Sequence, residues 1–498
     1  MHGRGAWRFL LLLMLWLAGS RAAAQTQQGG APAVALPGDV RDSLVVLSPP
    51  CPAGMGRAVV GQVMFLGNTR TRERILRAEL DLREGDSLTT ADLYARLDAN
   101  RRRLFNLQLF HAVVCHAVCR EGRLLIVFTV RERWYFFPSP IFSLAERNPR
   151  AWLARRDFSR LDYGLHLVQQ NFRGRNELLT ANLQHGFNRK YELFYTLPYA
   201  FSRRQGLGLQ LAGSLYQSHS IDYALAADRL LTYKDADAFP IRRWYAAAAL
   251  LKRYTVERQL RLGVRYTYER VTDSVLRRQP RYFGLPGTPR WRSWIEGDFH
   301  YARNHTNAFA YPTRGSALDL GFNPRIGVGG ASQLTALAQA AYRWYRPVGR
   351  RETLFYAAGL RGQLRLTRTV GFADNQALGY RATVRGYDLY VLNGQHYAVL
   401  RQGLTQRLFD VGRLPLPLRP GSRFGDIPLA AYVGLFADVG YVRDASALAR
   451  TNPLSNQMVG AVGAGLHIVT YYDRVIVLEA ALNHRRQSSF VVSTGFPI

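Results

Sequence analysis

The chain of 498 residues is 48% hydrophobic and 12% aromatic, and its 66 basic and 35 acidic residues give a net charge of +31. After the amino terminus no segment offers about 18 uninterrupted apolar residues, so the sequence excludes transmembrane helices. The apolar residues are instead spread out, as they are where they alternate with polar residues along strands. A water-soluble all-β protein and a membrane barrel both fit this composition.

Residues 1–24 have the organisation of a secretory signal peptide. Arg4 and Arg8 give a positively charged start, and an apolar run follows from Phe9 to Ala18. The small residues Ala22 to Ala24 then form a cleavage site. The apolar run is too short to span a bilayer. We therefore expect the mature chain outside the cytoplasm.

The excess of positive charge is carried mostly by arginine. Nucleic-acid binding is one interpretation, but an exported chain rarely meets nucleic acid, so no such partner is expected. A surface rich in anionic lipid, or a polar lumen lined by arginine, explains the excess better. A bias in base composition would explain the choice of arginine over lysine, but not the excess over acidic residues.

Residues 25–57 are rich in Gln, Gly, Ala and Pro and predict a flexible leader, which contains Cys51. Cys115 and Cys119 lie four apart on a predicted strand, about 13 Å from each other, so they cannot bridge each other. Two interpretations remain: Cys51 forms a disulfide with one of them, or the cysteines are small buried residues. Two nearby histidines make a metal site conceivable, but the spacing on a strand suits one poorly, and no metal is expected.

Residues 58–132 predict a small α+β module. A strand ends at the turn Gly67-Asn68, two helical patterns follow over 71–82 and 89–107, and two strands flank the turn at 119–122. The order β-α-α-β-β is typical of a compact two-layer domain.

This pattern resembles a POTRA domain, the periplasmic polypeptide-binding module of outer-membrane assembly and secretion barrels. The matching positions are Gly67, Asn68, Thr71, Ile75, Glu79, Leu80, Gly85, Leu97, Leu104, Phe110 and Val113. Most of them are core or turn positions, so they mark the fold and not a chemistry.

After a proline-containing linker at 133–154, residues 155–498 repeat one pattern of amphipathic strands. In 207–217 and 358–366, for example, apolar residues alternate with polar ones. A transmembrane barrel requires this alternation, and its sheet must close because every backbone group in lipid must be paired. We predict a mainly β protein, a transmembrane antiparallel β-barrel of about 16 strands after one small α+β domain. A soluble sandwich is the alternative.

One short motif predicts a functional loop, namely Val384, Arg385, Gly386 and Tyr387, followed by five strand-like segments. Alone, the Arg-Gly pair could be a surface turn. A guanidinium, however, presents a planar fork that suits a fixed carboxylate, and glycine allows the backbone to bend where a side chain would clash.

A second motif supplies a partner for this loop. Phe436, Asp438 and Gly440 of the segment FADVG share one face of a predicted strand. With the amino-terminal pattern and the segment YPTRG at 311–315, the two motifs resemble the BamA/TamA and two-partner secretion superfamily, also known as bacterial surface antigen barrels, over residues 58–498.

The resemblance implies that the loop folds into the barrel, where its arginine meets the acidic residue on the inner wall. It also implies a weak seam between the first and last strands, at 162–170 and 489–496, through which clients enter.

The leading hypothesis is therefore an outer-membrane barrel that assists insertion or translocation of polypeptides, with the POTRA domain in the periplasm capturing clients by strand addition. A dedicated two-partner secretion pore and a structural barrel without clients are the alternatives. The implied partners are outer-membrane lipid and lipopolysaccharide, unfolded or exported polypeptides, and accessory lipoproteins. The sequence contains no nucleophile elbow, zinc-protease motif or P-loop, and neither an enzyme nor a cofactor is expected.

Overall fold

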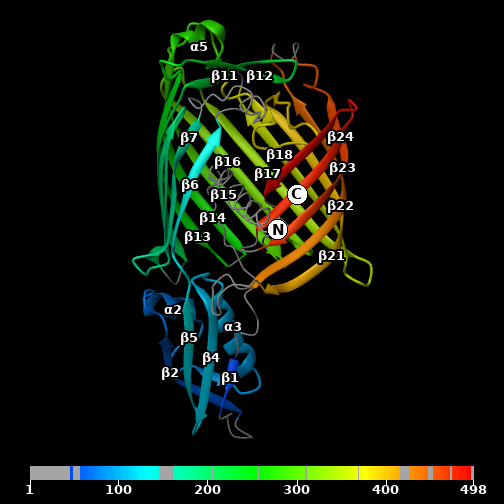
Figure 1. The fold of residues 1–498 in the computed structure, drawn as a ribbon. Coiled ribbons are helices and arrows are strands. Elements are labelled where there is room, and N and C mark those ends of the chain that lie inside the picture. The colour runs from blue at the N-terminus through cyan, green and yellow to red at the C-terminus, as the bar shows by residue number, and fades with distance from the viewer. Residues whose placement is uncertain are drawn as a thin grey trace, which may run out of the picture.

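A computed structural model describes residues 45–48, 56–144, 161–202, 206–255, 257–308, 311–367, 370–415, 426–446, 452–470 and 474–494. The predicted signal peptide and most of the predicted leader, with Cys51, lie outside the described residues. Within these ranges no helix is long and apolar enough to cross a membrane. The described residues form a small amino-terminal domain at one end of a β-barrel (Figure 1).

The amino-terminal domain is a five-stranded sheet, in the order β1-β4-β5-β2-β3, with two helices on one face. Its elements are β1 (Val45–Leu47), β2 (Arg57–Leu66), α2 (Glu73–Glu79), β3 (Ser87–Thr89), α3 (Leu93–Phe105), β4 (Phe110–Arg120) and β5 (Arg123–Glu132). The predicted order of one strand, two helices and two strands is present, with β1 and β3 in addition.

The helices are held on the sheet by their apolar sides. Leu76, Leu97 and Leu104 are fully buried and pack in one cluster with Phe110 and Val113 of β4. Burial of such side chains contributes about 1.5–3 kcal/mol each. The apolar positions that sequence periodicity selected therefore form the core of this domain.

Part of the predicted leader is structured. Val45–Leu47 pairs in parallel with Cys115 to Ala117 and covers part of the edge of β4. The prediction of a flexible leader up to residue 57 is therefore wrong for this strand, because three residues of β-forming sequence suffice to extend an existing edge.

The two cysteines of β4 differ in state. Cys119 is disulfide-bonded, whereas Cys115 is free and fully buried. Burial raises the pKa of the Cys115 thiol to about 12, so this thiol stays protonated and unreactive.

The barrel is one sheet of 16 strands, in the order β25-β24-β23-β22-β21-β18-β17-β16-β15-β14-β13-β10-β9-β8-β7-β6. Neighbouring strands are antiparallel, and the predicted fold class and strand number are confirmed. The strands are β6 (Phe136–Leu144), β7 (Leu161–Phe172), β8 (Glu177–Gly186), β9 (Asn188–Ser202), β10 (Leu207–Ser218), β13 (Ile241–Arg253), β14 (Arg258–Val271), β15 (Trp291–Thr306), β16 (Gly315–Gly330), β17 (Thr335–Val348), β18 (Leu354–Leu366), β21 (His396–Pro415), β22 (Asp426–Arg443), β23 (Met458–Thr470), β24 (Arg474–Asn483) and β25 (Ser488–Thr494).

The alternation that predicted the barrel separates its two faces. In β18, Leu360 and Leu364 are each 55% exposed on the outer face, while Gln363 between them is only 6% exposed inside. The outer face is therefore apolar and the lumen polar, as a bilayer requires.

The barrel begins earlier than predicted. Phe136–Leu144 is its first strand, β6, paired along its length with β7. Residues 133–154 are therefore not a linker throughout, and the stretch at 162–170 belongs to the second strand. The prolines of Phe136–Leu144 favoured a linker in the sequence, but an edge strand tolerates proline.

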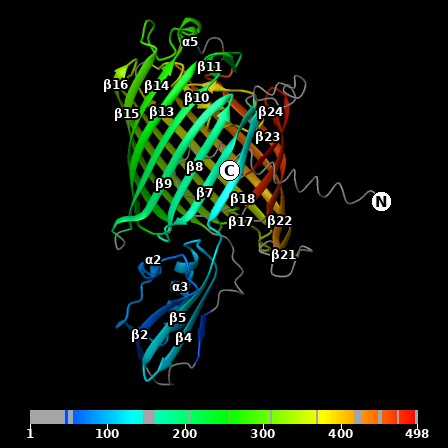
Figure 2. The ribbon, with the colours of Figure 1, turned by 60° about the vertical axis from the view of Figure 1, so that its left-hand side comes forward.

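The hairpin β11 (Ser220–Ala226) and β12 (Arg229–Lys234) and the helix α5 (Asp273–Arg278) lie at the end of the barrel opposite the amino-terminal domain (Figures 1 and 2). The other two elements are the short paired strands β19 (Gln376–Leu378) and β20 (Leu392–Asn393). The last two belong to the connection from β18 to β21, which carries the predicted functional loop.

Candidate functional site

The connection between β18 and β21 folds back into the barrel and brings Arg385 to the inner wall. The guanidinium donates two hydrogen bonds to Asp438 of β22, from Nε to Oδ2 at 2.8 Å and from Nη2 to Oδ1 at 2.6 Å. The Arg385 backbone N–H donates to the same carboxylate at 3.1 Å. Side chain and backbone of the loop are thus fixed by one wall residue.

A second carboxylate completes the clamp. Arg385 Nη1 donates to Glu479 Oε1 of β24 at 2.8 Å, and the guanidinium lies over the ring of Phe436, 3.8 Å from its centroid. Asp438 is 1% exposed and Glu479 7% exposed. Burial on this scale makes each ion depend on its partners, because an unpaired charge is costly away from water.

Arg401 of β21 balances the charges of the clamp. Its Nε lies 3.9 Å from Asp438 Oδ2, and its guanidinium donates to the backbone oxygen and, at 2.7 Å, to the hydroxyl of Thr383. Two arginines therefore face two carboxylates, Asp438 and Glu479, which leaves no net charge in the clamp.

Two glycines make room for the loop. A Cβ at Gly440 would lie 2.7 Å from Cγ2 of Val384, which is 2% exposed. Gly386 has φ +85°, and a Cβ there would lie 3.0 Å from the Cβ of Ala461. Gly440 thus provides space for the loop, and Gly386 provides the left-handed backbone that ordinary side chains disfavour.

Tyr387 anchors the far side of the loop. It is buried in an apolar cluster with Val384 and Val459, and its hydroxyl donates to the Gly460 backbone oxygen at 3.4 Å and contacts His484. All seven residues that the two motifs predicted are thus brought together in one region of the lumen.

Sequence reasoning missed Glu479 and the wall glycine Gly463. A Cβ at Gly463 would lie 2.4 Å from the ring of Phe436, so this glycine admits the ring that the guanidinium covers. The only signal for Glu479 was an acidic residue at a lumen-facing position, with apolar residues on both sides of it at 475–478 and 480–482.

The site is built to hold a loop. Its charged side chains form ion pairs with one another. Among the described residues no group of three or more His, Cys, Asp or Glu could hold a metal ion. The paired hydrogen bonds from a guanidinium to a carboxylate fix the orientation of the arginine side chain and also add to its binding energy. The arrangement therefore positions the loop against β22 and β24.

The amino-terminal domain is attached to the barrel through a buried polar contact. Asn171, near the end of β7, donates to Thr71 Oγ1 at 2.8 Å, and the Arg72 backbone N–H donates to the oxygen of Gly174, in the turn after β7, at 2.9 Å. Thr71 also donates to Glu132 Oε1 at 2.5 Å from its hydroxyl and 2.6 Å from its backbone. These bonds join the end of β7 and the turn between β7 and β8 to the small domain.

Two family models match the chain. Residues 171–470 match the Omp85 superfamily domain, and residues 58–133 match the POTRA domain described as a surface antigen variable number repeat. No curated protein matches it.

Several solved structures are similar. BamA from Haemophilus ducreyi lacking POTRA domains 1–3 is 17% identical, with 88% of this chain and 84% of that chain covered and a TM-score of 0.57. CdiB from Escherichia coli is 13% identical, with 98% and 97% covered and a TM-score of 0.51. CdiB from Acinetobacter baumannii is 15% identical, with 88% and 73% covered and a TM-score of 0.49.

The Omp85 match covers more than half of the chain, which therefore belongs to the Omp85 superfamily. Its barrel lies in the outer membrane of a Gram-negative cell and its POTRA domain in the periplasm. The end that carries α5 and the β11–β12 hairpin consequently faces the outside of the cell.

Proposed function

We propose that this barrel assists the insertion or translocation of polypeptides at the outer membrane, with the POTRA domain capturing clients. The observation that carries the proposal is the state of the two end strands. In the described part of the chain, β6 and β25 are the ends of the sheet, and no ladder joins them. A sheet edge of this kind is a template for another strand.

The sequence of β6 weakens its open edge. In an antiparallel strand, the N–H and C=O of one residue point to the same edge, and successive residues alternate. Tyr135 O accepts from Gln170 N at 2.7 Å, so odd-numbered residues of β6 face β7. Pro138 and Pro140 therefore face the open edge, where each removes an N–H donor.

The edge of β25 keeps its donors. Asn483 N donates to Gln487 O at 3.1 Å, which places the odd-numbered residues of β25 toward β24. Ser488, Phe490, Val492 and Thr494 then present their backbone groups at the open edge. Closure of β6 on β25 leaves up to two backbone oxygens of β25 without a donor, one for each proline, whereas an incoming client strand without proline supplies both donors.

Insertion and export differ in what passes this seam. An inserter releases a folded barrel sideways into lipid, and a dedicated pore passes one extended partner through the lumen. Lipopolysaccharide around the barrel and accessory lipoproteins at the POTRA domain belong to the same proposal. No catalytic role is assigned to the chain.

The test is client folding in liposomes that contain the purified chain. An unfolded model barrel is added, and its folding is followed by the change in its migration on unheated gels. We expect the wild-type chain to accelerate folding, and the variant Pro138→Ala/Pro140→Ala to do so less, because restored donors strengthen closure of the seam.

The matched control is Ser139→Ala, a change in the same strand at a residue that faces β7. It should leave the acceleration intact. If the wild-type chain gives no acceleration and only conducts ions, the insertion claim fails, and an exporter or a barrel without clients is favoured. Equal acceleration by the proline variant would show that the seam does not limit the reaction.

A further inference from the structure

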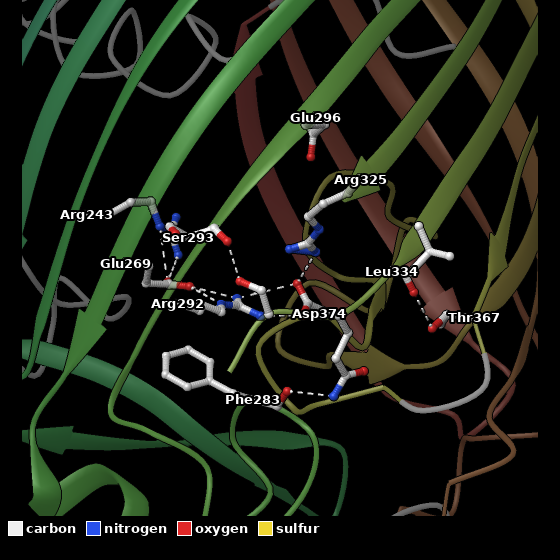
Figure 3. A network of polar contacts seen from close by, with 12 residues as sticks. Arg243, Glu269, Phe283, Arg292, Ser293, Glu296, Arg325, Leu334, Thr367 and Asp374 are labelled. Carbon is white, nitrogen blue, oxygen red and sulfur yellow. Dashed lines mark hydrogen bonds and ion pairs between the residues drawn. The ribbon is translucent and has the colours of Figure 1, made fainter. Parts of the chain in front are cut away.

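A second charged cluster lies where β14 ends and β15 begins, the two strands that α5 connects (Figure 3). Asp374, from the inward-folded connection, accepts from Arg292 Nη1 at 2.5 Å and from Arg325 Nη2 at 2.6 Å. Arg292 Nε also donates to Glu269 at 2.8 Å, and Arg243 Nε donates to the same carboxylate at 3.1 Å.

This cluster encloses a small cavity lined by side chains from four adjacent strands. Arg292 and Trp294 come from β15, Arg325 from β16, Thr335 from β17 and Arg365 from β18. Two guanidinium groups contact the Trp294 ring, with Arg292 at 4.8 Å and Arg325 at 4.6 Å from its centroid. These cation–π contacts fix the cavity wall.

The cavity carries an excess of positive charge. Three arginines line it, Arg292, Arg325 and Arg365, and Asp374 is the one carboxylate in its lining. Arg292 shares Glu269 with Arg243, so Glu269 does not remove the excess. The neighbouring Glu296 is paired with Arg265 at 3.8 Å.

Three donors of the lining have no partner. Within the described residues, Trp294 Nε1, Thr335 Oγ1 and Arg365 Nε are buried and make no hydrogen bond. Trp294 is 7% exposed and Thr335 8% exposed, so bulk water does not solvate them. A buried donor that stays unpaired destabilises the folded state, because it has given up its hydrogen bonds to water without replacing them.

We propose that the cavity binds a small monatomic anion of the size of chloride. The free space has room for about one water-sized sphere. A water molecule accepts two hydrogen bonds and carries no charge, whereas a halide accepts three and also offsets the guanidinium excess. The anion would hold the guanidinium groups of Arg292 and Arg325 in place, and these in turn bind Asp374 of the inward-folded connection. This proposal does not depend on client handling.

The direct test is a crystal of the full mature chain grown in bromide. An anomalous peak bounded by Trp294, Thr335 and Arg365 is expected. The second test is the midpoint of thermal unfolding in detergent, in sodium chloride and in sodium gluconate at equal ionic strength. We expect the midpoint to rise with chloride and to saturate.

Thr335→Val keeps the shape of the side chain and removes one donor, and Arg365→Gln removes the charge. Both should lose the chloride response. The matched control is Arg361→Gln, with the same charge change on the same inward face of β18 outside the cavity lining, and it should keep the response. A wild-type midpoint that does not respond to chloride, with no bromide peak, would overturn the proposal in favour of water. Loss of the chloride response in the Arg361→Gln control would also overturn the proposal. So would a larger rise of the wild-type unfolding midpoint in sodium phosphate at the same ionic strength.

Discussion

Val384 occupies the space that the missing side chain of Gly440 leaves on the barrel wall. A Cβ on Gly440 would lie 2.7 Å from Val384 Cγ2 and 3.1 Å from Leu378 Cδ1, closer than carbon atoms pack. Val384 is 2% exposed and Leu378 1% exposed, so neither can move aside without repacking the cluster around the loop.

Gly440→Ala should therefore displace the loop from the wall. Overpacking of this kind costs about 1–3 kcal/mol, and we expect a lower midpoint of thermal unfolding and easier proteolysis of the loop. Gly362→Ala is the matched control, because a Cβ there meets only the Tyr397 backbone oxygen at 3.5 Å, an ordinary contact. An equal fall of the unfolding midpoint in Gly440→Ala and Gly362→Ala would mean that the contact with Val384 does not cause the loss of stability.

Arg385→Ala should destabilise the chain more than removal of an exposed ion pair with the same geometry. It leaves the carboxylates of Asp438 and Glu479 buried without their main partner, which costs about 3–5 kcal/mol. Arg314 Nη2 lies 2.6 Å from Glu352 Oε1, the same distance as in the clamp, but both side chains are 60% exposed. Arg314→Ala should cost less than about 1 kcal/mol.

Denaturant unfolding of the two variants measures this difference. Arg385→Lys should lie between them, because lysine keeps the charge but lacks the planar fork. Equal stability of the Arg385→Ala and Arg314→Ala variants would show that water reaches the clamp and that the clamp does not hold the loop.

Local patterns predicted the barrel well because its strands obey one rule. Polar and apolar residues alternate wherever lipid lies on one side and the lumen on the other, so strands such as Leu354–Leu366 are visible from the sequence alone. The same rule failed for Phe136–Leu144, where two prolines are compatible only with an edge. Whether a strand is an edge strand is a property of the assembled sheet and not of the segment.

The candidate site was partly predictable for a related reason. Arg385 and Asp438 belong to short motifs, whereas Glu479 stands alone in its strand and meets Arg385 only in the folded chain. The cavity that contains Arg292, Arg325 and Arg365 was not predictable, since these three arginines lie on three different strands and no spacing in the sequence joins them.

The junction between the two domains should be sensitive to acid. Partial burial raises the pKa of the Glu132 carboxyl, but the hydrogen bonds that it accepts from Thr71, Thr69 and Arg70 outweigh this and hold the pKa below its ordinary value of 4.5. The stabilisation is therefore present above pH 4.5 and lost as the pH falls through the lower folded pKa.

Protonation of Glu132 should release Thr71, which also binds Asn171 of the barrel. We expect distances between spin labels on the POTRA domain and the barrel to broaden at low pH, and Glu132→Gln to broaden them at neutral pH. Glu121→Gln, on the hairpin turn of the same domain, is the control. A distribution that stays narrow in Glu132→Gln would show that the carboxylate does not hold the junction.

In the POTRA domain β3 pairs only with Arg57 to Val59 of β2, and at Val63, beyond this pairing, a pair of side chains blocks the edge of β2. The Val63 backbone N–H donates to Glu84 Oε1 at 3.3 Å, and the Val63 oxygen accepts from Arg77 Nη2 at 2.8 Å. Arg77 and Glu84 are also 3.4 Å apart and together form a clip. A client strand that adds to this edge must displace the clip before it can pair with Val63.

Glu84→Ala should therefore strengthen the binding of extended client peptides. It frees the Val63 N–H, and one backbone hydrogen bond contributes about 0.5–1.5 kcal/mol, which corresponds to an affinity increase of about 2- to 10-fold. Fluorescence anisotropy of a labelled client peptide measures the change. Glu121→Ala removes the same charge from the same domain and should have no effect. Tighter binding in both variants would indicate a charge effect, and no change in Glu84→Ala would mean that clients do not add to the β2 edge.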